Sequence, residues 1–453
     1  MLSRNALAVR GFALAGGAAS VSRPSFASAA EENVSRLSNG LTVASVDMHG
    51  GVSQLLVAFR AGSRYEQPDE VGLVHHLRNL IGTDSKNYLA VKLLWQSGSI
   101  GSTLVSSSSK DLLTVQMAVT RTNANVGLSL LGEFAQPAFK PWDTEDASIT
   151  LEEDLVLQQP YELVIENLHK AAYRNGSLAN SLLSPAERVG KVTYKQLAAY
   201  GESRLVASQA VLVGVNVEHS LLLDYANSQD SIALGGSVAE RTKGPHSSPY
   251  IGGDVRQYGD TPMAHVVIAG NGGRLNDEKS AAATFAVLAY VIGKGSNLKY
   301  PNAPSFGVVE KAVAKAANHN PAAVSAVNIL HADAGLCGVY LTAHGERVFP
   351  LVRAAADALK SLAGSNVDNE TLAVAKKFAQ VDANVNAADS SAAANDRAAL
   401  ILADSVNTST ADFVKSIDAV SAEDVKKAAA QVVSKLSLSA YGKINQVPYV
   451  DQL

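Results

Sequence analysis

The amino-acid sequence predicts an α+β fold with two similar lobes, each a mainly antiparallel sheet covered by helices. Its length and composition are the first observation, since 453 residues with 47% hydrophobic content can bury more than one core. The second is a succession of segments with strand-type alternation, each followed by helix-type periodicity. The third is an internal repeat, because the two halves of the chain open and close alike.

In the first half, strand patterns precede helix patterns. The run SQLLVAF is apolar and strand-like, and DLLTVQMAVT alternates so that Leu113, Val115, Met117 and Val119 share one face. This alternation is typical of an antiparallel sheet covered on one side. The segments EDASITLEEDLVL and PYELVIENLHKAAY predict two helices separated at Pro160, which suits the first turn of the second helix.

The second half repeats this organisation. KSAAATFAVLAYVIG is apolar on all sides and predicts a buried helix, and the Ala-rich stretch 373–403 favours packed helix. Each half ends with a capped helix and a strand, the caps being Thr193 with Gln196 and Ser421 with Asp424. Thr193 and Ser421 lie 228 positions apart, as do the glycines of the two strands that follow. The order of these features indicates a duplicated unit.

The stretch SIALGGSVAERTKGPHSSPY has the Gly, Ser and Pro content of a surface linker. We therefore expect an N-terminal lobe over residues 27–230, a linker over 231–249 and a C-terminal lobe over 250–453.

The first 26 residues have the composition of a mitochondrial transit peptide. They carry three arginines and no acidic residue, and are rich in Ala and Ser. A secretory signal is the alternative, but arginines flank its candidate apolar core on both sides. No window has the eighteen or more apolar residues of a membrane span, so membrane contact is expected only through partners.

Charge and cysteine content exclude some classes of function and of covalent cross-link. The net charge is −4 with no basic block, which argues against nucleic-acid binding. The single cysteine, Cys337, allows no internal disulfide and is expected to be a buried apolar residue.

The stretch GLVHHLRNL resembles a zinc-protease helix that lacks the general base and one of the metal-binding histidines. In the H-x-x-E-H motif two imidazoles hold the metal, and the carboxylate takes a proton from the bound water. Here His75 occupies the first ligand position, Arg78 the position of the base and Asn79 that of the second imidazole. His76 cannot substitute, because it lies about 100° around the helix from His75. A permanent cation at Arg78 repels Zn²⁺ and accepts no proton.

No other chemistry emerges from the sequence. The remaining histidines show no ligand spacing, the Gly-rich stretches GNGGR and GKGS lack the nucleotide-binding patterns, and G-x-S-x-G is absent. We therefore predict no catalytic residue, no bound metal and no cofactor.

Four stretches, LSNGLTVAS, AGSRYE, the altered motif at 75–79 and ENLHKAAYRNGSLANSLLSP, resemble the pitrilysin-like family. This family contains the mitochondrial processing peptidases and the core subunits of respiratory complex III. SFGVVEKAVAK, HADAGLCGVYLTA and the closing PYVDQL point to the core subunits. Active members carry two glutamates seven residues apart on a later helix, and Glu145 and Glu152 correspond to them. A pair between Glu152 and Arg78 is expected across the former site.

The resemblance implies a non-catalytic scaffold, peripheral on the matrix side of the mitochondrial inner membrane. Its implied partners are a related core subunit, cytochrome b, cytochrome c1 and the Rieske protein, within a homodimeric complex. Two alternatives remain: the substrate-recognising, non-catalytic subunit of a processing peptidase, and an active metalloprotease. The resemblance also implies a chamber between the lobes, for which a presequence peptide is the candidate occupant.

Overall fold

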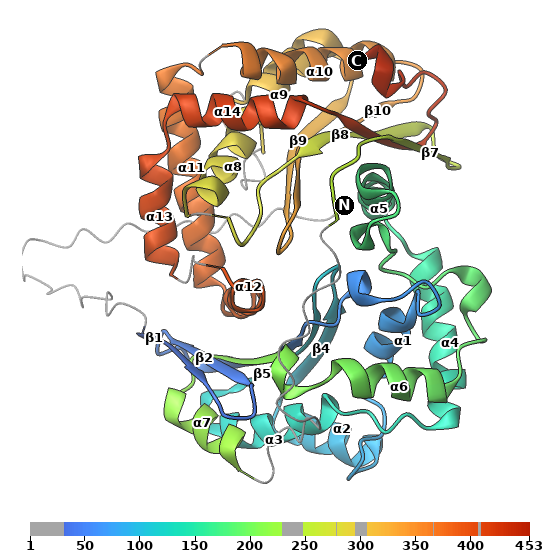
Figure 1. Ribbon diagram of the computed structural model, residues 1–453, viewed down its shortest axis with the longest axis vertical. Coiled ribbons are helices and arrows are strands. Elements are labelled where there is room, and N and C mark those ends of the chain that lie inside the picture. Colours follow the sequence, from blue (N-terminus) through green and yellow to red (C-terminus); the bar gives the residue numbers. More distant parts are fainter. Residues whose placement is uncertain (1–30, 229–247, 278, 295–305, 366, 406–408) are drawn as a thin grey trace, which may run out of the picture.

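The computed structural model describes residues 31–228, 248–277, 279–294, 306–365, 367–405 and 409–453. Two sheets, each with its own helices, form two lobes stacked along the long axis in Figure 1, which confirms the predicted fold class. The predicted transit peptide, 1–26, and all but the last two residues of the predicted linker, 231–249, lie outside the described residues.

Within the described chain, the sheet of the first lobe has six strands in the order β1-β2-β6-β3-β5-β4. β2 and β6 run parallel, and the other neighbours are antiparallel. Runs of β-branched and aliphatic residues, such as AVLVGV in β6, favour this pleated, buried conformation. The strands are β1 (Glu31–Arg36), β2 (Thr42–Asp47), β3 (Val52–Phe59), β4 (Thr103–Ser108), β5 (Leu113–Thr120) and β6 (Ala210–Val215).

The described part of the second lobe has five strands in the order β7-β11-β8-β10-β9. This order, with one parallel pair at β7 and β11, reproduces the order β2-β6-β3-β5-β4 of the first lobe strand for strand. The expected duplication is therefore present in the topology. The strands are β7 (Asp254–Tyr258), β8 (Met263–Asn271), β9 (Ala322–Leu330), β10 (Gly335–His344) and β11 (Ser437–Gly442).

Helices of the first half follow the strands as the sequence predicts. They are α1 (Leu73–Asn79), α2 (Ala90–Ser99), α3 (Ala124–Phe134), α4 (Pro141–Val156), α5 (Pro160–Tyr173), α6 (Tyr194–Arg204) and α7 (His219–Asn227). The second half contributes α8 (Lys279–Ile292), α9 (Val308–Ala317), α10 (Val348–Gly364), α11 (Asn369–Ala388), α12 (Ser390–Leu402), α13 (Thr410–Ala419) and α14 (Ala422–Val433). Among the described helices, none has the length and apolar composition of a membrane span.

Both predicted capping boxes are confirmed. The Thr193 hydroxyl accepts the backbone N–H of Gln196 at the start of α6, and the Ser421 hydroxyl accepts that of Asp424 at the start of α14. Each cap satisfies a backbone donor that the first turn leaves without a helical partner.

Each sheet is covered on its second face by a helix from the other half of the chain. α12 packs Ala394, Ala398 and Leu402 onto the first sheet, and α5 packs its apolar side onto β8 and β10 of the second. Figure 1 shows both helices between the two sheets. Small alanines let α12 approach the strands closely. The lobes are therefore interlocked through these two exchanged helices.

The exchange changes one expectation about β5. The alternating pattern of this strand predicts a sheet covered on one side, and Leu113, Val115 and Met117 do face a buried core. The opposite face is buried too, because α12 covers it: the Gln116 amide donates to the Ser391 hydroxyl at 2.9 Å and accepts from Asn395 at 2.9 Å. The polar side chains on this face of β5 form hydrogen bonds with α12 in place of water. For this reason the alternating sequence of β5 resembles that of a strand with one exposed face.

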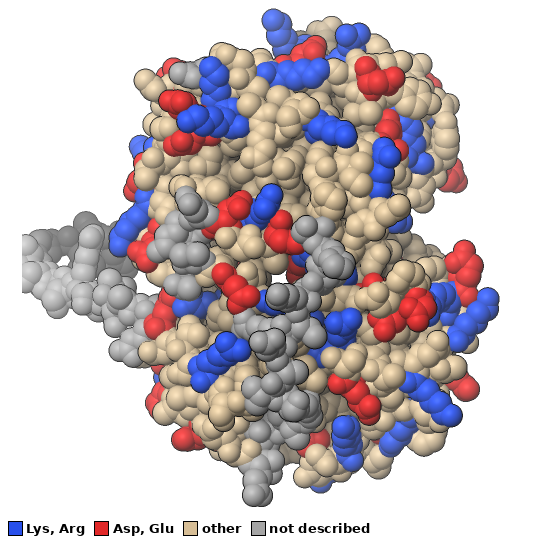
Figure 2. All heavy atoms as spheres, in the orientation of Figure 1, with Lys and Arg blue, Asp and Glu red and all other residues tan. Residues whose placement is uncertain are grey.

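Acidic and basic side chains are interspersed over the face of the molecule in Figure 2. Mixed charge of this kind offers no continuous basic surface for a nucleic-acid backbone on that face.

Candidate functional site

The altered zinc motif lies on α1, a short helix whose start is fixed by two residues. Gly72 precedes it with φ of 92°, a conformation that favours glycine, and a side chain there would meet Ser184. The carboxylate of Glu66 accepts the N–H groups of Gly72 and Val74 at 3.0 and 2.7 Å. Burial raises the pKa of Glu66 to about 7. The first turn of α1 is thereby held in one orientation against α4.

His75 is completely buried and has a defined tautomer. Its Nδ1 accepts the backbone N–H of Ser184 at 3.1 Å, so the proton is on Nε2, which donates to Asp154 at 2.9 Å. Burial is the largest cause that lowers the pKa of His75, to about 4, so the ring is neutral. This is the arrangement of a structural histidine with both nitrogens engaged.

Three donors converge on one carboxylate oxygen. Oδ2 of Asp154 accepts from His75, from the Arg78 guanidinium and, at 3.3 Å, from the Asn79 amide. Burial raises the pKa of Asp154, but the hydrogen bond from His75 and the charge of Arg78 outweigh it, and the net direction is downward. The three motif positions from the sequence are therefore brought together around a carboxylate.

That carboxylate is not the one expected. Glu145 and Glu152 are exposed on α4, whereas Ala147, Leu151 and Asp154 form its stripe toward α1. Arg78 thus pairs with Asp154 in place of Glu152, and the predicted pair is wrong by two residues. A carboxylate two positions away on a helix points about 200° around the axis. The signal that identifies Asp154 is its helical phase with Ala147 and Leu151.

The donor set does not fit a tetrahedral zinc ion. Zinc needs four ligands with free lone pairs, and Arg78 contributes a fixed positive charge to the same oxygen that His75 uses. His76 does not help, since its Nδ1 bonds the Gly72 carbonyl and its ring lies 6.4 Å from that of His75 at 73°. No group of three or more His, Cys, Asp or Glu side chains in the described residues is placed to hold a metal.

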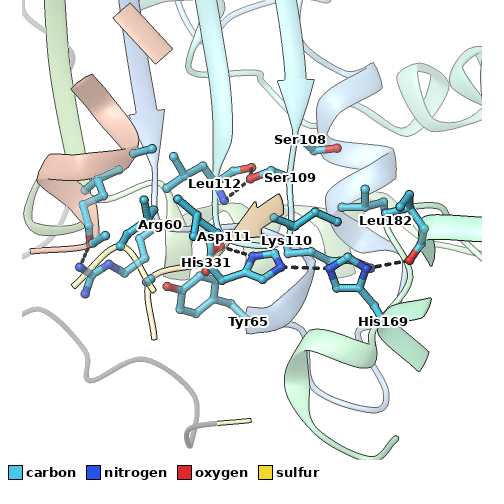
Figure 3. Close-up of a pocket in the computed structure, with 18 of the residues that line it drawn as sticks. Arg60, Tyr65, Ser108, Ser109, Lys110, Asp111, Leu112, His169, Leu182 and His331 are labelled. Carbon is cyan, nitrogen blue, oxygen red and sulfur yellow. Dashed lines mark hydrogen bonds and ion pairs between the residues drawn. The ribbon is translucent and has the colours of Figure 1, made fainter. Parts of the chain in front are cut away.

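A cavity of about 420 Å³ lies between the lobes. Both halves contribute to its walls, including Lys110 and Asp111 from the first and His331 from the second (Figure 3). His169 and His331, which have no ligand-like spacing in the sequence, form a hydrogen bond here at 3.0 Å. The sequence contains no signal for this pair, because its members lie 162 positions apart.

Comparisons with known proteins agree with this fold. The family described as insulinase, peptidase family M16, matches residues 42–186. A chain of complex III2 from Candida albicans, solved with Inz-5 bound, superposes with a TM-score of 0.78 at 21% identity, covering 93% of this chain and 98% of that one. This structural likeness shows the two-lobed architecture.

Curated relatives match over most of the chain. Subunit 2 of the mitochondrial cytochrome b-c1 complex is 28% identical in Homo sapiens and 26% in Mus musculus, each over 426 residues that cover 92% of this chain and 91% of the relative. The α subunit of the mitochondrial processing peptidase of Solanum tuberosum is 25% identical and is covered to 85%. The predicted resemblance is thus confirmed: the chain is similar to subunit 2 of the cytochrome b-c1 complex over nearly its whole length, and residues 42–186 match peptidase family M16.

Proposed function

We propose that this chain is core subunit 2 of mitochondrial complex III, the ubiquinol–cytochrome c reductase. In this role it is a non-catalytic scaffold that supports assembly and stability of the complex, peripheral to the inner membrane on the matrix side. Core subunit 1, cytochrome b, cytochrome c1 and the Rieske protein are its partners, and the complex is a homodimer.

The observation that carries the proposal is a two-lobed fold in which an ion pair fills the position of the zinc motif. Arg78 and Asp154 occupy the place where an active relative needs a base and a metal. Shape is thereby kept while the chemistry is lost, which suits a subunit that other proteins assemble around. The match to subunit 2 over 92% of the chain supports the same conclusion.

The alternative, a substrate-recognising subunit of a processing peptidase, has less support. The potato α subunit matches at 25% identity and is covered to 85%, against 28% and 91% for human subunit 2. Recognition subunits of processing peptidases carry a long glycine-rich loop in the second lobe, whereas the corresponding stretch here, 292–305, has only two glycines. Most of this stretch lies outside the described residues.

Depletion tests the scaffold role. Mitochondria from which this chain has been removed should lose the assembled, haem-bearing complex, and re-expression of the wild-type chain should restore it. Normal amounts of complex III without the chain would reject the proposal.

Zinc binding tests the non-catalytic part. The purified wild-type chain should retain no stoichiometric zinc after dialysis, measured by elemental analysis. The matched control is the double variant Arg78→Glu with Asn79→His, which supplies a base and a second imidazole beside Asp154 and should acquire zinc. One equivalent of zinc in the wild-type chain would contradict the assignment.

A further inference from the structure

Two hairpin turns, one from each sheet, meet at the seam between the lobes. The β4–β5 turn is closed by a hydrogen bond from Ser109 N to Leu112 O, and the β9–β10 turn by one from His331 N to Ala334 O. His331 of one turn contacts Asp111 of the other beside the inter-lobe cavity, where Figure 3 shows Asp111, His331 and His169 joined in a row. This contact between turns is one polar part of the seam, in addition to the packing of α5 and α12 against the sheets.

Arg64 links the two turns directly. Its guanidinium donates to Asp111 at 2.6 Å and to Asp333 at 2.7 Å, and its side chain is only 3% exposed. One carboxylate belongs to each lobe, so a single cation bridges them. A buried guanidinium with two carboxylates leaves one negative charge uncompensated.

His331 forms a second bridge in the same place. Its Nδ1 lies 2.8 Å from Oδ2 of Asp111, and its Nε2 lies 3.0 Å from Nε2 of His169. His169 in turn places its Nδ1 2.8 Å from the carbonyl oxygen of Ile165. Both imidazoles are buried, with 5% and 2% exposure for His331 and His169.

Hydrogen-bond chemistry fixes the number of protons on this pair. The Ile165 carbonyl only accepts, so Nδ1 of His169 carries a proton, and the Asp111 carboxylate only accepts, so Nδ1 of His331 carries one. A third proton is needed between the two Nε2 atoms, since otherwise two lone pairs would face each other at 3.0 Å. Three protons on two rings give the pair one positive charge.

The surroundings place that charge on His331. Burial, and after it the charge of Lys110, lower the pKa of His169 well below the usual range, so this ring is neutral. Asp111 stays ionised: burial raises its pKa, but hydrogen bonds and charge from His331 and Arg64 lower it to about 2. Lys110 pairs with Glu166 at 2.8 Å, which adds no net charge.

A protonated His331 also balances the cluster. Without it, Arg64 faces two carboxylates, Asp111 and Asp333, whereas with it two cations face two anions. The neighbouring phenols of Tyr65 and Tyr173 contribute no charge, because burial raises the pKa of both. The hydrogen-bond directions require this proton, and charge balance favours it.

We propose that the seam is a proton-dependent latch: the two hairpin turns take up one proton as they meet, and His331 holds it between Asp111 and His169. When the turns separate, water can satisfy both rings, so the third proton is no longer required. The closed state then binds more protons than the open state, and closure weakens as pH rises. Because one proton is exchanged, the equilibrium shifts toward the open seam by up to about tenfold per pH unit.

Nitrogen NMR of the wild-type chain labelled with ¹⁵N-histidine tests the bound proton. At pH 7.5 one ring should show both nitrogens protonated, and this signal should vanish in His331→Gln. A wild-type spectrum with only neutral imidazoles at pH 7.5 would overturn the proposal. Because the wild-type spectrum decides the outcome, the test does not depend on whether His331→Gln folds.

Hydrogen exchange followed by mass spectrometry tests the latch itself. The exchange rates are first corrected for the intrinsic effect of pH. For peptides spanning 109–112 and 331–334, the opening equilibrium constant should then be larger at pH 8.5 than at pH 6.5, by as much as about a hundredfold. The exposed-histidine variant His344→Gln is the matched control and should behave like the wild-type chain. Equal corrected protection at both pH values would show that no proton couples to closure.

Discussion

At position 78 a guanidinium stands where a zinc protease has a carboxylate, and its effect extends to three neighbours. Arg78, His75 and Asn79 all donate to one oxygen of Asp154, so a single acidic side chain on α4 organises the whole motif. The link between α1 and α4 that a metal provides in active relatives is thereby made by hydrogen bonds.

Replacing Arg78 with Ala should lower the free energy of unfolding by roughly 1 kcal/mol, because Asp154 then keeps only neutral donors in a half-buried site. The estimate is small since the Arg78 and Asp154 side chains are 22% and 31% exposed and solvent screens the pair. Urea unfolding measures the change.

The control for this substitution is Glu152→Ala. Glu152 is exposed on the same helix, and its loss should change stability by less than about 0.5 kcal/mol. A larger loss of stability for Glu152→Ala than for Arg78→Ala would contradict the Arg78–Asp154 pair and support the pair with Glu152 that the motif spacing suggested.

Sequence reasoning found part of this site. The i, i+3, i+4 spacing correctly groups His75, Arg78 and Asn79 on one face of α1, because helix periodicity is local. The carboxylate partner depends on how α4 is rotated against α1, and a spacing rule carried over from relatives misplaced it by two residues. The pair of His169 and His331 depends on contact between the lobes, for which no local pattern exists.

At the level of elements, the two exchanged helices set the architecture. α5 and α12 each lie in one half of the sequence and cover the sheet of the other. Strand alternation predicts which face of a strand is apolar, but not which helix covers it. β5 is the example: its polar face, which the alternation would leave to solvent, forms hydrogen bonds with α12.

The repeated caps give matched predictions for two elements. Thr193→Ala and Ser421→Ala should each reduce stability by about 1 kcal/mol, because each leaves a first-turn N–H without its acceptor. Thermal or urea unfolding of the single variants measures this. Ser409→Ala is the control, since its side chain caps no N–H in α13, and its effect should be clearly smaller. Equal losses at all three positions would refute the capping account.

For the whole molecule, the strand order of the two sheets shows a duplicated unit that the sequence predicts from its caps and glycines. The lobe limits 27–230 and 250–453 remain a proposal. These limits follow the composition of the linker. Because α5 and α12 are exchanged, neither segment contains all the helices that pack on its own sheet.

Expressing these two segments separately should therefore give chains that lack cooperative unfolding. Each would expose an apolar sheet face, including Leu56 and Val213 in the first and Val267 in the second. Mixing the segments should restore a sigmoidal urea transition. Cooperative unfolding of either segment alone would show that the exchange is not needed for stability.

Native separation of mildly solubilised mitochondria tests the central claim most directly. The chain is followed by antibody, and the same band is scanned for haem absorbance. A scaffold of complex III should migrate in a large membrane assembly whose band absorbs as haem. Migration as a haem-free soluble heterodimer would contradict the assignment and favour the processing-peptidase alternative.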